Sequence, residues 1–321
     1  MISNNNNNCE NKKGSSVVGE IKVSDEILTF GKVEKLDNTD IKLAHPMARK
    51  LINDNKLDIN LIKPKDGEII MVTDVQDYLN QNSFLQQFKN LDIETKPMSP
   101  VQKAMMKKMS ESKQMIPHAT MFIDLEINKL WEHRKTLKNE LASENIPVTF
   151  LTLMLKAMTI VLAKNPIFNS SVSPDYKIVY KKQINLGFAI DSPKGLIVLV
   201  IKNANDLSLK QIAIKQKELI EKAQKGIITR DMIGDSTFTI TNFGSLGAKY
   251  GTPIINYPES AILGMGLIFK KPTWDENNQL SFDYILPLSL AFDHRHLAGG
   301  DASRFVKDLV ETLKDHKNFI I

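Results

Sequence analysis

Cysteine is nearly absent from this sequence, because the 321 residues contain only one, Cys9. A lone cysteine excludes a disulfide or a cysteine-based metal site within one chain, and it fits a reducing compartment such as the cytoplasm. Cys9 lies in a polar, asparagine-rich segment where nothing would activate a thiol, which argues against a nucleophilic role. We therefore expect a cytoplasmic protein whose chemistry does not depend on cysteine.

Several other patterns are missing. No apolar stretch is long enough to span a bilayer, and residues 1–16 lack the apolar core of a signal peptide. HExxH, GxGxxG and P-loop patterns are absent. His294 and His296 would share one face of a strand, but no third ligand is evident, so no metal site is expected. The net charge is +5, yet no basic block carries interleaved aromatics, so neither a nucleic acid nor a membrane is an expected partner.

What is present divides the chain into four segments. Residues 1–40 begin as an asparagine-rich tail and continue as a weakly patterned linker, so we predict disorder there. Residues 41–80 contain two short helical patterns, the second with Thr73 as its N-cap, and residues 81–96 read as a polar linker. Residues 97–321 contain long helices and several strands, which predicts one very small domain and one large one.

Residues 97–321 alternate between strand-like and helical periodicity, which is typical of an α+β fold with a mixed sheet. The expected strands are His118–Ile127, Lys182–Asp191, Gly195–Lys202, Thr237–Thr241, Ala261–Phe269 and Ile285–Phe292. The expected helices follow Ser99 as an N-cap or cover Thr149–Pro166, Leu209–Gly226 and Asp301–His316.

His294 is the strongest candidate for a catalytic group. It follows the apolar run 285–292 and precedes a predicted turn at Gly299 and Gly300. A histidine at the end of a strand is well placed to be held rigid, and its imidazole accepts a proton near neutral pH. The alternative, a hydrogen-bonded loop histidine without a chemical role, is the default for a lone histidine.

A hydroxyl-rich stretch, Thr237–Thr241, is the second candidate. In a strand, Thr239 and Thr241 project to the same side. The β-propensity of threonine alone would account for this stretch, and from the spacing we prefer that explanation.

Residues 41–80 resemble the peripheral subunit-binding domain of 2-oxo acid dehydrogenase complexes. The matching residues, in order, are Pro46, Ala48-Arg49-Lys50-Leu51, Asp58, Asp74-Val75 and Tyr78-Leu79. The family's loop ends in a second arginine, where this chain has Ile69. Because arginines of that domain contact acidic partner surfaces, the resemblance implies that Arg49 binds a partner. That partner would be the 2-oxo acid decarboxylase component, dihydrolipoyl dehydrogenase, or both.

Residues 97–321 resemble the catalytic domain of the dihydrolipoyl acyltransferases, whose fold is that of chloramphenicol acetyltransferase. The matching motifs, in family order, are Asn169-Ser170, Gly187–Asp191, Gly195–Val198, Phe238–Asn242, Gly251–Asn256, Ala261–Gly264 and Asp293-His294-Arg295. The resemblance implies acyl transfer between dihydrolipoamide and coenzyme A, with His294 as the base. It implies that the Thr241 hydroxyl stabilises the tetrahedral oxyanion, from a different subunit of a homotrimer that assembles into a larger cage.

Two departures from that family concern the support of His294. Ala298 stands where the family normally has an aspartate, and Gln102 aligns with a helix arginine. In the related acetyltransferase fold this aspartate and arginine form an ion pair that supports the histidine. Losing both leaves no buried charge unpaired. We therefore expect the support of His294 to be supplied by other residues.

A lipoyl domain is not recognisable in these residues, so the lipoyl group is expected from another domain or chain, or the sequence is a truncated product. Acetyl is the expected acyl group because pyruvate dehydrogenase complexes are the common case. The alternative is a structural core with weak or no catalysis; retention of His294 and Thr241 favours the enzyme. The apolar end, Phe319-Ile320-Ile321, resembles the family's contact between trimers.

Overall fold

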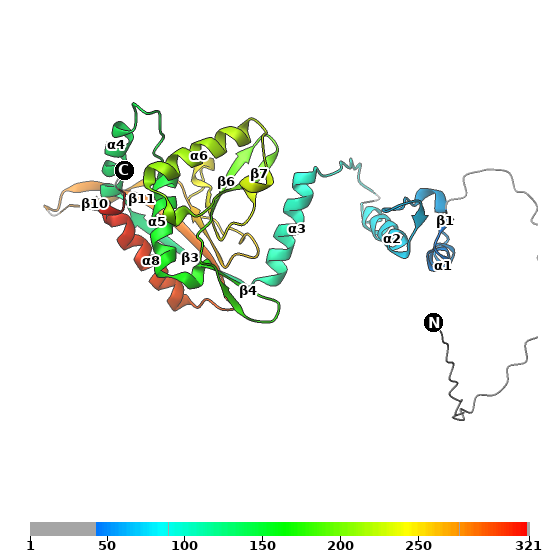
Figure 1. Ribbon diagram of the computed structural model, residues 1–321. Coiled ribbons are helices and arrows are strands. Elements are labelled where there is room, and N and C mark those ends of the chain that lie inside the picture. Colours follow the sequence, from blue (N-terminus) through cyan, green and yellow to red (C-terminus); the bar gives the residue numbers. More distant parts are fainter. Residues whose placement is uncertain (1–42, 89, 276, 320–321) are drawn as a thin grey trace, which may run out of the picture. The chain divides into compact units, whose positions relative to one another are not determined.

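The computed structural model describes residues 43–88, 90–275 and 277–319, which form two compact units divided after Thr95 (Figure 1). The disorder predicted for residues 1–40 lies outside the described residues, as do Ile320 and Ile321. Within the described ranges, no helix is long and apolar enough to cross a membrane. The two units are described separately below.

The small unit is built from two helices held by a short parallel strand pair. Its elements are β1 (Leu43–Ala44), α1 (Pro46–Asp54), a 3-10 turn (Ile59–Leu61), β2 (Ile69–Ile70) and α2 (Val72–Gln86). Its core contains the buried residues Ala48, Ile52, Ile62, Ile70 and Val75. The buried carboxylate of Asp74 accepts hydrogen bonds from the backbone N–H groups of Met71 and Lys65, at 2.8 and 3.3 Å, and so ties the loop to α2.

Helix α2 differs from the sequence-based expectation at both ends. It begins after Met71 as N-cap, so Thr73 lies inside the helix rather than capping it. It continues to Gln86, into the stretch 81–96 that was expected to be a linker. The segment from 80 to 86 is polar, and the sequence reading took polarity for irregular structure, although polar residues also form exposed helices.

The large unit is a seven-stranded mixed sheet covered by helices. Strand order is β10-β11-β9-β8-β6-β7, with β3 pairing with β11 as well. The strands are β3 (His118–Glu126), β6 (Leu186–Ser192), β7 (Gly195–Ile201), β8 (Phe238–Asn242), β9 (Ala261–Met265), β10 (Phe269–Trp274) and β11 (Leu280–Asp293). Strands β6, β8 and β9 run parallel, and the pairs β6–β7, β9–β11, β3–β11 and β10–β11 are antiparallel.

The helices of the large unit are α3 (Pro100–Met115), α4 (Asn128–Glu140), α5 (Phe150–Lys164), α6 (Leu209–Gln224), α7 (Arg230–Ile233) and α8 (Gly299–Lys314). Helices α5, α6 and α8 lie side by side against the sheet (Figure 1) and share one continuous apolar core with it. The most deeply buried helix is α5, because its sequence is apolar on nearly every side.

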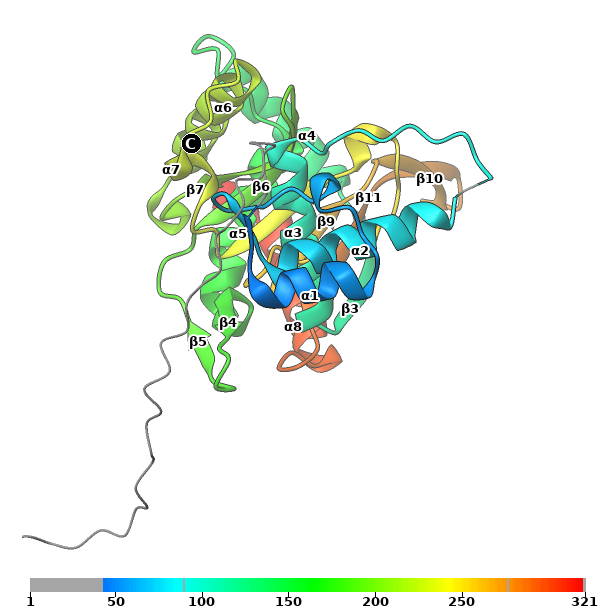
Figure 2. The same ribbon diagram turned by 90° about the vertical axis from the view of Figure 1, so that its right-hand side faces the viewer.

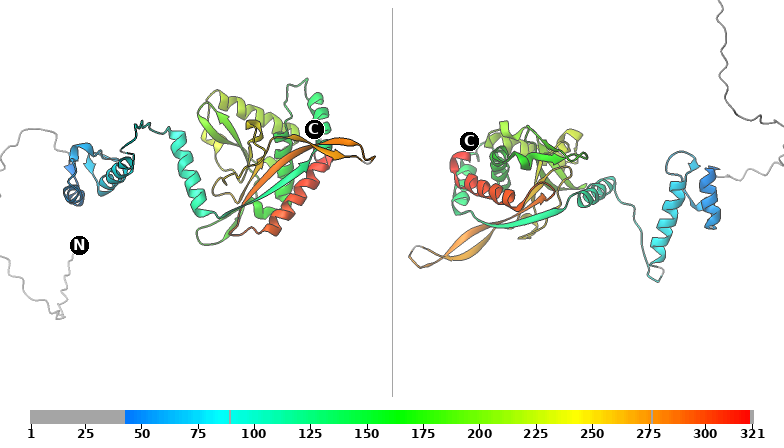
Figure 3. Two further views of the ribbon diagram at one scale, coloured as in Figure 1. Left: turned by 180° about the vertical axis from the view of Figure 1, so that it is seen from behind. Right: turned by 90° about the horizontal axis from the view of Figure 1, so that it is seen from below.

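Two hairpins project from this packed body. One is formed by β4 (Ser170–Val172) and β5 (Ile178–Tyr180), with the exposed Tyr176 at its tip (Figure 2). The other is formed by β10 and the first half of β11 (Figure 3), and its outer end carries the exposed side chains of Trp274 and Phe282. Strand β11 therefore runs from an exposed hairpin into the centre of the sheet.

The α+β architecture expected from the sequence is confirmed, including the cap at Ser99 and the β6–β7 strand pair. One expectation was wrong. Gly299 and Gly300 are the first residues of α8 rather than a separate turn. Phe319 is fully buried in the core of its own chain, while Ile320 and Ile321 lie outside the described residues, so the contact between trimers expected of this apolar end stays a prediction.

Candidate functional site

His294 lies in the turn that follows β11. Its backbone N–H donates to the carbonyl of Pro117 at 3.1 Å, and its ring lies 5.6 Å from the ring of Phe292. The side chain is exposed, and its imidazole forms no hydrogen bond within the described part of the chain. The backbone is thus fixed while both ring nitrogens stay available to a ligand.

Asp293 anchors the same turn from inside the protein. The residue is 1% exposed, and its backbone N–H donates to the carbonyl of Ser260 at 2.8 Å. Its carboxylate accepts from the Arg295 guanidinium, with Nη2 at 2.6 Å and Nε at 2.9 Å, and from the Arg295 backbone N–H at 3.0 Å. The hydrogen bond that Arg295 donates to Asp293 raises the pKa of Arg295. A buried carboxylate paired in this bidentate way is not left as an uncompensated charge.

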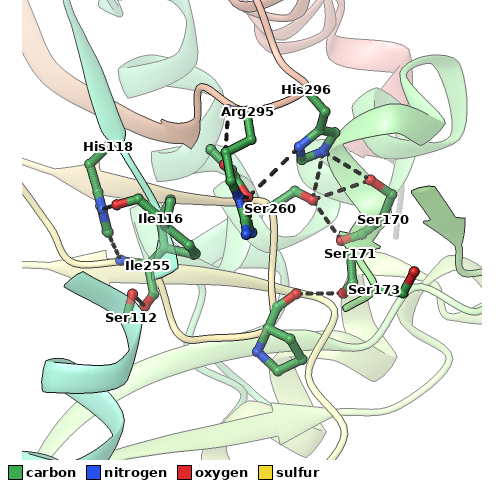
Figure 4. Close-up of polar contacts among 12 residues, drawn as sticks. Ser112, Ile116, His118, Ser170, Ser171, Ser173, Ile255, Ser260, Arg295 and His296 are labelled. Atoms are coloured by element: carbon green, nitrogen blue, oxygen red, sulfur yellow. Dashed lines mark hydrogen bonds and ion pairs between the residues drawn. The ribbon is translucent and has the colours of Figure 1, made fainter. Parts of the chain in front are cut away.

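The next histidine, His296, points into the protein (Figure 4). Its Nε2 lies 3.0 Å from Oγ of Ser260 and 3.3 Å from Oγ of Ser170, and both serines are fully buried. Burial lowers the pKa of His296, because it disfavours the charged form. The sequence reading, which placed His294 and His296 on one face of a strand, was therefore wrong: both lie in a turn, and only His294 is exposed.

His118, the strand partner of Asp293 in β3, holds the loop before β9. Its Nε2 accepts the backbone N–H of Ile255 at 3.1 Å, so its Nδ1 carries the proton and donates to the carbonyl of Ile116 at 2.9 Å (Figure 4). Burial lowers the pKa of His118. The hydroxyl of Ser112 in α3 donates to the carbonyl of Ile255 at 2.7 Å, so α3 and β3 hold the same loop residue.

Thr241 lies near the carboxyl end of β8 and is half-buried. Its hydroxyl forms no hydrogen bond to any residue that the structure describes, so it is free to donate to a ligand. The threonine that shares its side of the strand, Thr239, is used differently. Its hydroxyl donates to the buried carboxylate of Glu259 at 2.8 Å.

Glu259 is itself an unusual buried group. Its Oε1 accepts hydrogen bonds from Thr239, Ser236 and Asn256, while its Oε2 has no hydrogen-bond partner among the described residues. Complete burial raises the pKa of Glu259, and the three hydrogen bonds only partly oppose this. Glu259 therefore holds β8 and the loop before β9 together, and Thr241 remains the threonine of β8 with a free hydroxyl.

The sheet register shows that one chain does not bring Thr241 and His294 together. Thr241 pairs with Gly264 of β9, and Gly264 pairs with Ser289 of β11. Asp293, the last residue of β11, is four residues beyond Ser289, which is roughly 14 Å along an antiparallel strand. His294 lies further still, and Thr241 is also two strands away across the sheet.

A cavity of about 730 Å³ lies beside Asn242, the residue that follows Thr241. Asn242 and Gly244 line it, together with the basic side chains of Arg134 and Lys270. The backbones are packed closely here: a Cβ added at Gly244 would lie 2.3 Å from the carbonyl oxygen of Gly266. A Cβ added at Gly266 would lie 1.9 Å from another backbone carbonyl oxygen. This wall of the cavity is therefore formed by backbone that excludes side chains.

The two departures at Ala298 and Gln102 lie at helix starts. Ala298 is the exposed N-cap of α8, and its backbone N–H donates to the carboxylate of Asp301 at 2.9 Å. Gln102 forms a capping box with Ser99 at the start of α3, with bonds of 2.8 and 3.2 Å. Neither position carries a charge, so no ion pair between them supports His294. Gln102 has a local structural role instead.

Sequence reasoning missed His118, the Asp293–Arg295 ion pair and the environment of His296. The Asp-x-Arg spacing at a predicted strand end is a signal that could have revealed the ion pair. No group of three or more His, Cys, Asp or Glu residues in the described ranges is arranged to hold a metal ion. Arg49, the predicted partner-binding residue, is exposed on α1 in the small unit.

Comparison with known proteins gives one consistent family. The sequence profile described as 2-oxoacid dehydrogenases acyltransferase (catalytic domain) matches residues 90–321. The dihydrolipoyllysine-residue acetyltransferase component of the pyruvate dehydrogenase complex from Acholeplasma laidlawii is 38% identical over 329 residues, covering 95% of this chain and 60% of that protein. The corresponding Mycoplasma capricolum protein is 34% identical over 326 residues, covering 92% of this chain and 74% of that protein. The chain thus spans about 60% of the length of the first relative.

Solved structures agree. The dihydrolipoamide acetyltransferase (E2p) of Azotobacter vinelandii matches with a TM-score of 0.68 and 35% identity, covering 72% of this chain and 96% of that one. The cubic core of a pyruvate dehydrogenase multienzyme complex matches with a TM-score of 0.67 and 35% identity, covering 71% and 95%. The Azotobacter work concerns a serine, a histidine and an asparagine in the catalytic mechanism, the serine 52 residues before the histidine and the asparagine four after it. Here, Thr241 precedes His294 by 53 residues, and Ala298 follows it by four.

Proposed function

This chain belongs to the 2-oxoacid dehydrogenase acyltransferase family, and on that basis we propose that it transfers an acyl group, acetyl in the first instance, between dihydrolipoamide and coenzyme A. The observation that carries the proposal is the state of His294. Its backbone N–H donates to Pro117 and the preceding residue, Asp293, is bound to Ser260, while its imidazole is exposed and free of hydrogen bonds within the described residues. A general base needs both rigidity and access to the proton that it removes.

The proposed reaction uses the side chains of His294 and Thr241. His294 removes the proton from the thiol of coenzyme A, and the thiolate attacks the thioester carbonyl of the acylated dihydrolipoamide. The tetrahedral oxyanion accepts a hydrogen bond from Thr241. Loss of such a donor costs about 2.7–4 kcal/mol in barrier height. The intermediate collapses by breaking the bond to the lipoyl sulfur, and that sulfur takes the proton from His294, which regenerates the neutral base.

We place the two catalytic residues of one site on neighbouring chains of a trimer. The register of the sheet supports this placement, because Thr241 and His294 of one chain are separated along β11 and across two strands. Assembly of trimers into a larger cage is in keeping with the similarity to a cubic core. The cage of this chain and its symmetry are proposals that the oligomeric mass would test.

The cavity after Thr241 is our candidate for the coenzyme A arm. Its volume of about 730 Å³ lies in the range of small-molecule sites. Arg134 and Lys270 supply positive charge for phosphate groups at its wall, and it begins at the residue that follows the proposed oxyanion donor. No metal is required for any step.

The remaining assignments are also proposals. Residues 41–80 would form a peripheral subunit-binding domain, 81–96 the linker, and 97–321 the catalytic domain. Arg49 would bind an acidic surface of the decarboxylase component or of dihydrolipoyl dehydrogenase. The lipoyl group would come from another domain or chain. The cytoplasmic location stays a prediction from the cysteine content.

The test is acetyl transfer from acetyl-CoA to free dihydrolipoamide by the assembled protein, with His294→Ala as the control. We expect turnover by the wild-type protein and a loss of about 10²–10⁴ in kcat for the variant, since that is what a positioned general base contributes. The second candidate is a catalytically inactive structural core, which the missing charge at Ala298 favours. An assembled wild-type protein without turnover would establish that alternative.

A further inference from the structure

His296 is a histidine with a buried side chain that the proposed reaction does not use. Its side chain is 6% exposed, and it lies two residues after His294. It lies close to three separate parts of the large unit: Ser170 at the start of β4 and Ser260 just before β9 (Figure 4), and Asp293 at the end of β11. A buried imidazole with these neighbours has a defined protonation state, and the hydrogen bonds around it show which one.

Both serine hydroxyls donate their hydrogen to backbone carbonyl oxygens. Oγ of Ser170 lies 2.7 Å from the carbonyl oxygen of Ile167, and Oγ of Ser260 lies 2.8 Å from the carbonyl oxygen of Ser170. A carbonyl oxygen only accepts, so each hydroxyl donates to it. Both hydroxyl oxygens therefore face Nε2 of His296 with lone pairs, and Nε2 must carry the hydrogen. The ring donates one shared hydrogen bond to two serines.

The other ring nitrogen of His296, Nδ1, carries no hydrogen. In this tautomer Nδ1 of His296 is an acceptor, and it is buried without a hydrogen-bond partner among the described residues. Oδ2 of Asp293 lies 3.8 Å from it, so a lone pair faces a carboxylate. The charged groups that act on this ring are Asp293, Arg295 and Asp301. Arg295 holds the same Oδ2 at 2.6 Å, which keeps the carboxylate turned toward the guanidinium.

From this geometry we propose that His296 is a positioning residue for His294. Its neutral ring ties the end of the catalytic turn to Ser170 and Ser260, while the Asp293–Arg295 pair ties the beginning. His294 lies between these two anchors, and its own backbone N–H is held by Pro117. Together they provide the support that a charged residue at position 298 would otherwise give. The inference rests on the proposed function, because positioning matters only if His294 is the base.

The proposal has a consequence for pH. When His296 gains a proton at Nδ1, the repulsion from Asp293 becomes an attraction, and Oδ2 is drawn away from Arg295. The anchor at the beginning of the turn then loosens, and the His294 imidazole loses its alignment. Misplacement of a catalytic group by about 1 Å can cost up to about 10²-fold in rate. The acid side of the kcat profile should therefore contain an ionisation of His296 in addition to that of the base.

Two variants separate positioning from simple packing. His296→Val removes every hydrogen bond of the ring, whereas His296→Gln keeps an amide N–H that can donate to the serines but cannot be protonated. We expect the valine variant to lose about tenfold in kcat with KM changed less than about twofold, because the loss falls on the transition state. We expect the glutamine variant to keep kcat within about threefold at pH 8 and to lose the extra ionisation on the acid side.

The measurements are kcat and KM from pH 5 to 9, with oligomeric mass and melting temperature as controls. Wild-type kcat in an assembled valine variant would overturn the proposal. If the valine variant does not assemble, the glutamine variant decides: an unchanged acid limb overturns the proposal, and a lost one supports it. Amide hydrogen exchange of residues 293–297 serves as a readout without activity. Faster exchange in the valine than in the glutamine variant supports the anchor, and equal exchange overturns it, even if the wild-type protein proves inactive and the proposed function fails.

Discussion

Mixing two inactive variants should restore activity if, as we propose, each site takes His294 from one chain and Thr241 from its neighbour. Thr241→Ala removes the oxyanion donor, for which about 10²–10³ in kcat is expected, and His294→Ala removes the base. In a trimer assembled at random from equal amounts of both, a site is intact when its histidine comes from the threonine variant and its threonine from the histidine variant. That occurs in about one site in four, so we expect about a quarter of wild-type activity from symmetric trimers.

The assay is acetyl transfer to dihydrolipoamide after co-expression of the two variants. Proteins purified separately and mixed without subunit exchange should stay inactive. A second mixture provides a matched control: wild-type chains assembled with chains that carry both substitutions. About a quarter of the activity is expected if the residues come from different chains, and about half if they come from the same chain. Co-assembled variants no more active than either parent, together with half-activity in the control, would refute the shared site.

Three further predictions concern stability. Ala298→Asn should supply the side-chain cap that α8 lacks. Such a cap stabilises a helix by about 1 kcal/mol, which raises the melting temperature of a domain of this size by about 2–4 °C. An unchanged melting temperature would show that α8 does not begin there. Burial lowers the pKa of His118, so the unfolded chain binds its proton first as pH falls below the ordinary value of 6.5, and wild-type stability should drop there. His118→Gln should flatten that drop in a pH series of denaturant unfolding, and an identical slope would contradict the assignment. Burial raises the pKa of Glu259, so the unfolded chain loses its proton first above the ordinary value of 4.5, and ionisation penalises the folded state as pH rises. The melting temperature of Glu259→Gln relative to wild type should therefore increase from pH 5 to pH 8, and a constant difference would rule this out.

The parts of the fold that could be predicted from sequence are the helices and strands whose hydrophobic pattern repeats over several turns or alternations. The α6 helix and the β6–β7 pair were found in this way, since their patterns repeat over several turns or alternations. The start of α8 was missed because Gly299 suggests a turn, whereas the first positions of a helix tolerate glycine when the carboxylate of Asp301 satisfies a backbone N–H. The hydrophobic pattern is enough to predict that helix α8 exists, but the glycine at its start leads to a wrong prediction of where it begins.

The candidate site was likewise predicted only in part. His294 and Thr241 were proposed from sequence with the aid of a family resemblance, but the anchors of the turn were not visible. His296 contacts Ser260, 36 residues away, and Ser170, 126 residues away. No spacing rule connects residues at such separations, because their meeting depends on the order of strands in the sheet. The support of a catalytic residue is a tertiary property, even when the residue itself lies in a short motif.

The backbone packing beside Thr241 determines how this protein could be altered in the laboratory. A library that randomises every residue around the large cavity would lose most of its members at Gly244 and Gly266, where any side chain would meet a neighbouring carbonyl. Diversity is better placed at Leu267, Ile268 and Lys270, whose side chains also line the cavity. Selections for a shortened or modified coenzyme A arm should therefore enrich changes at these three positions and leave both glycines untouched.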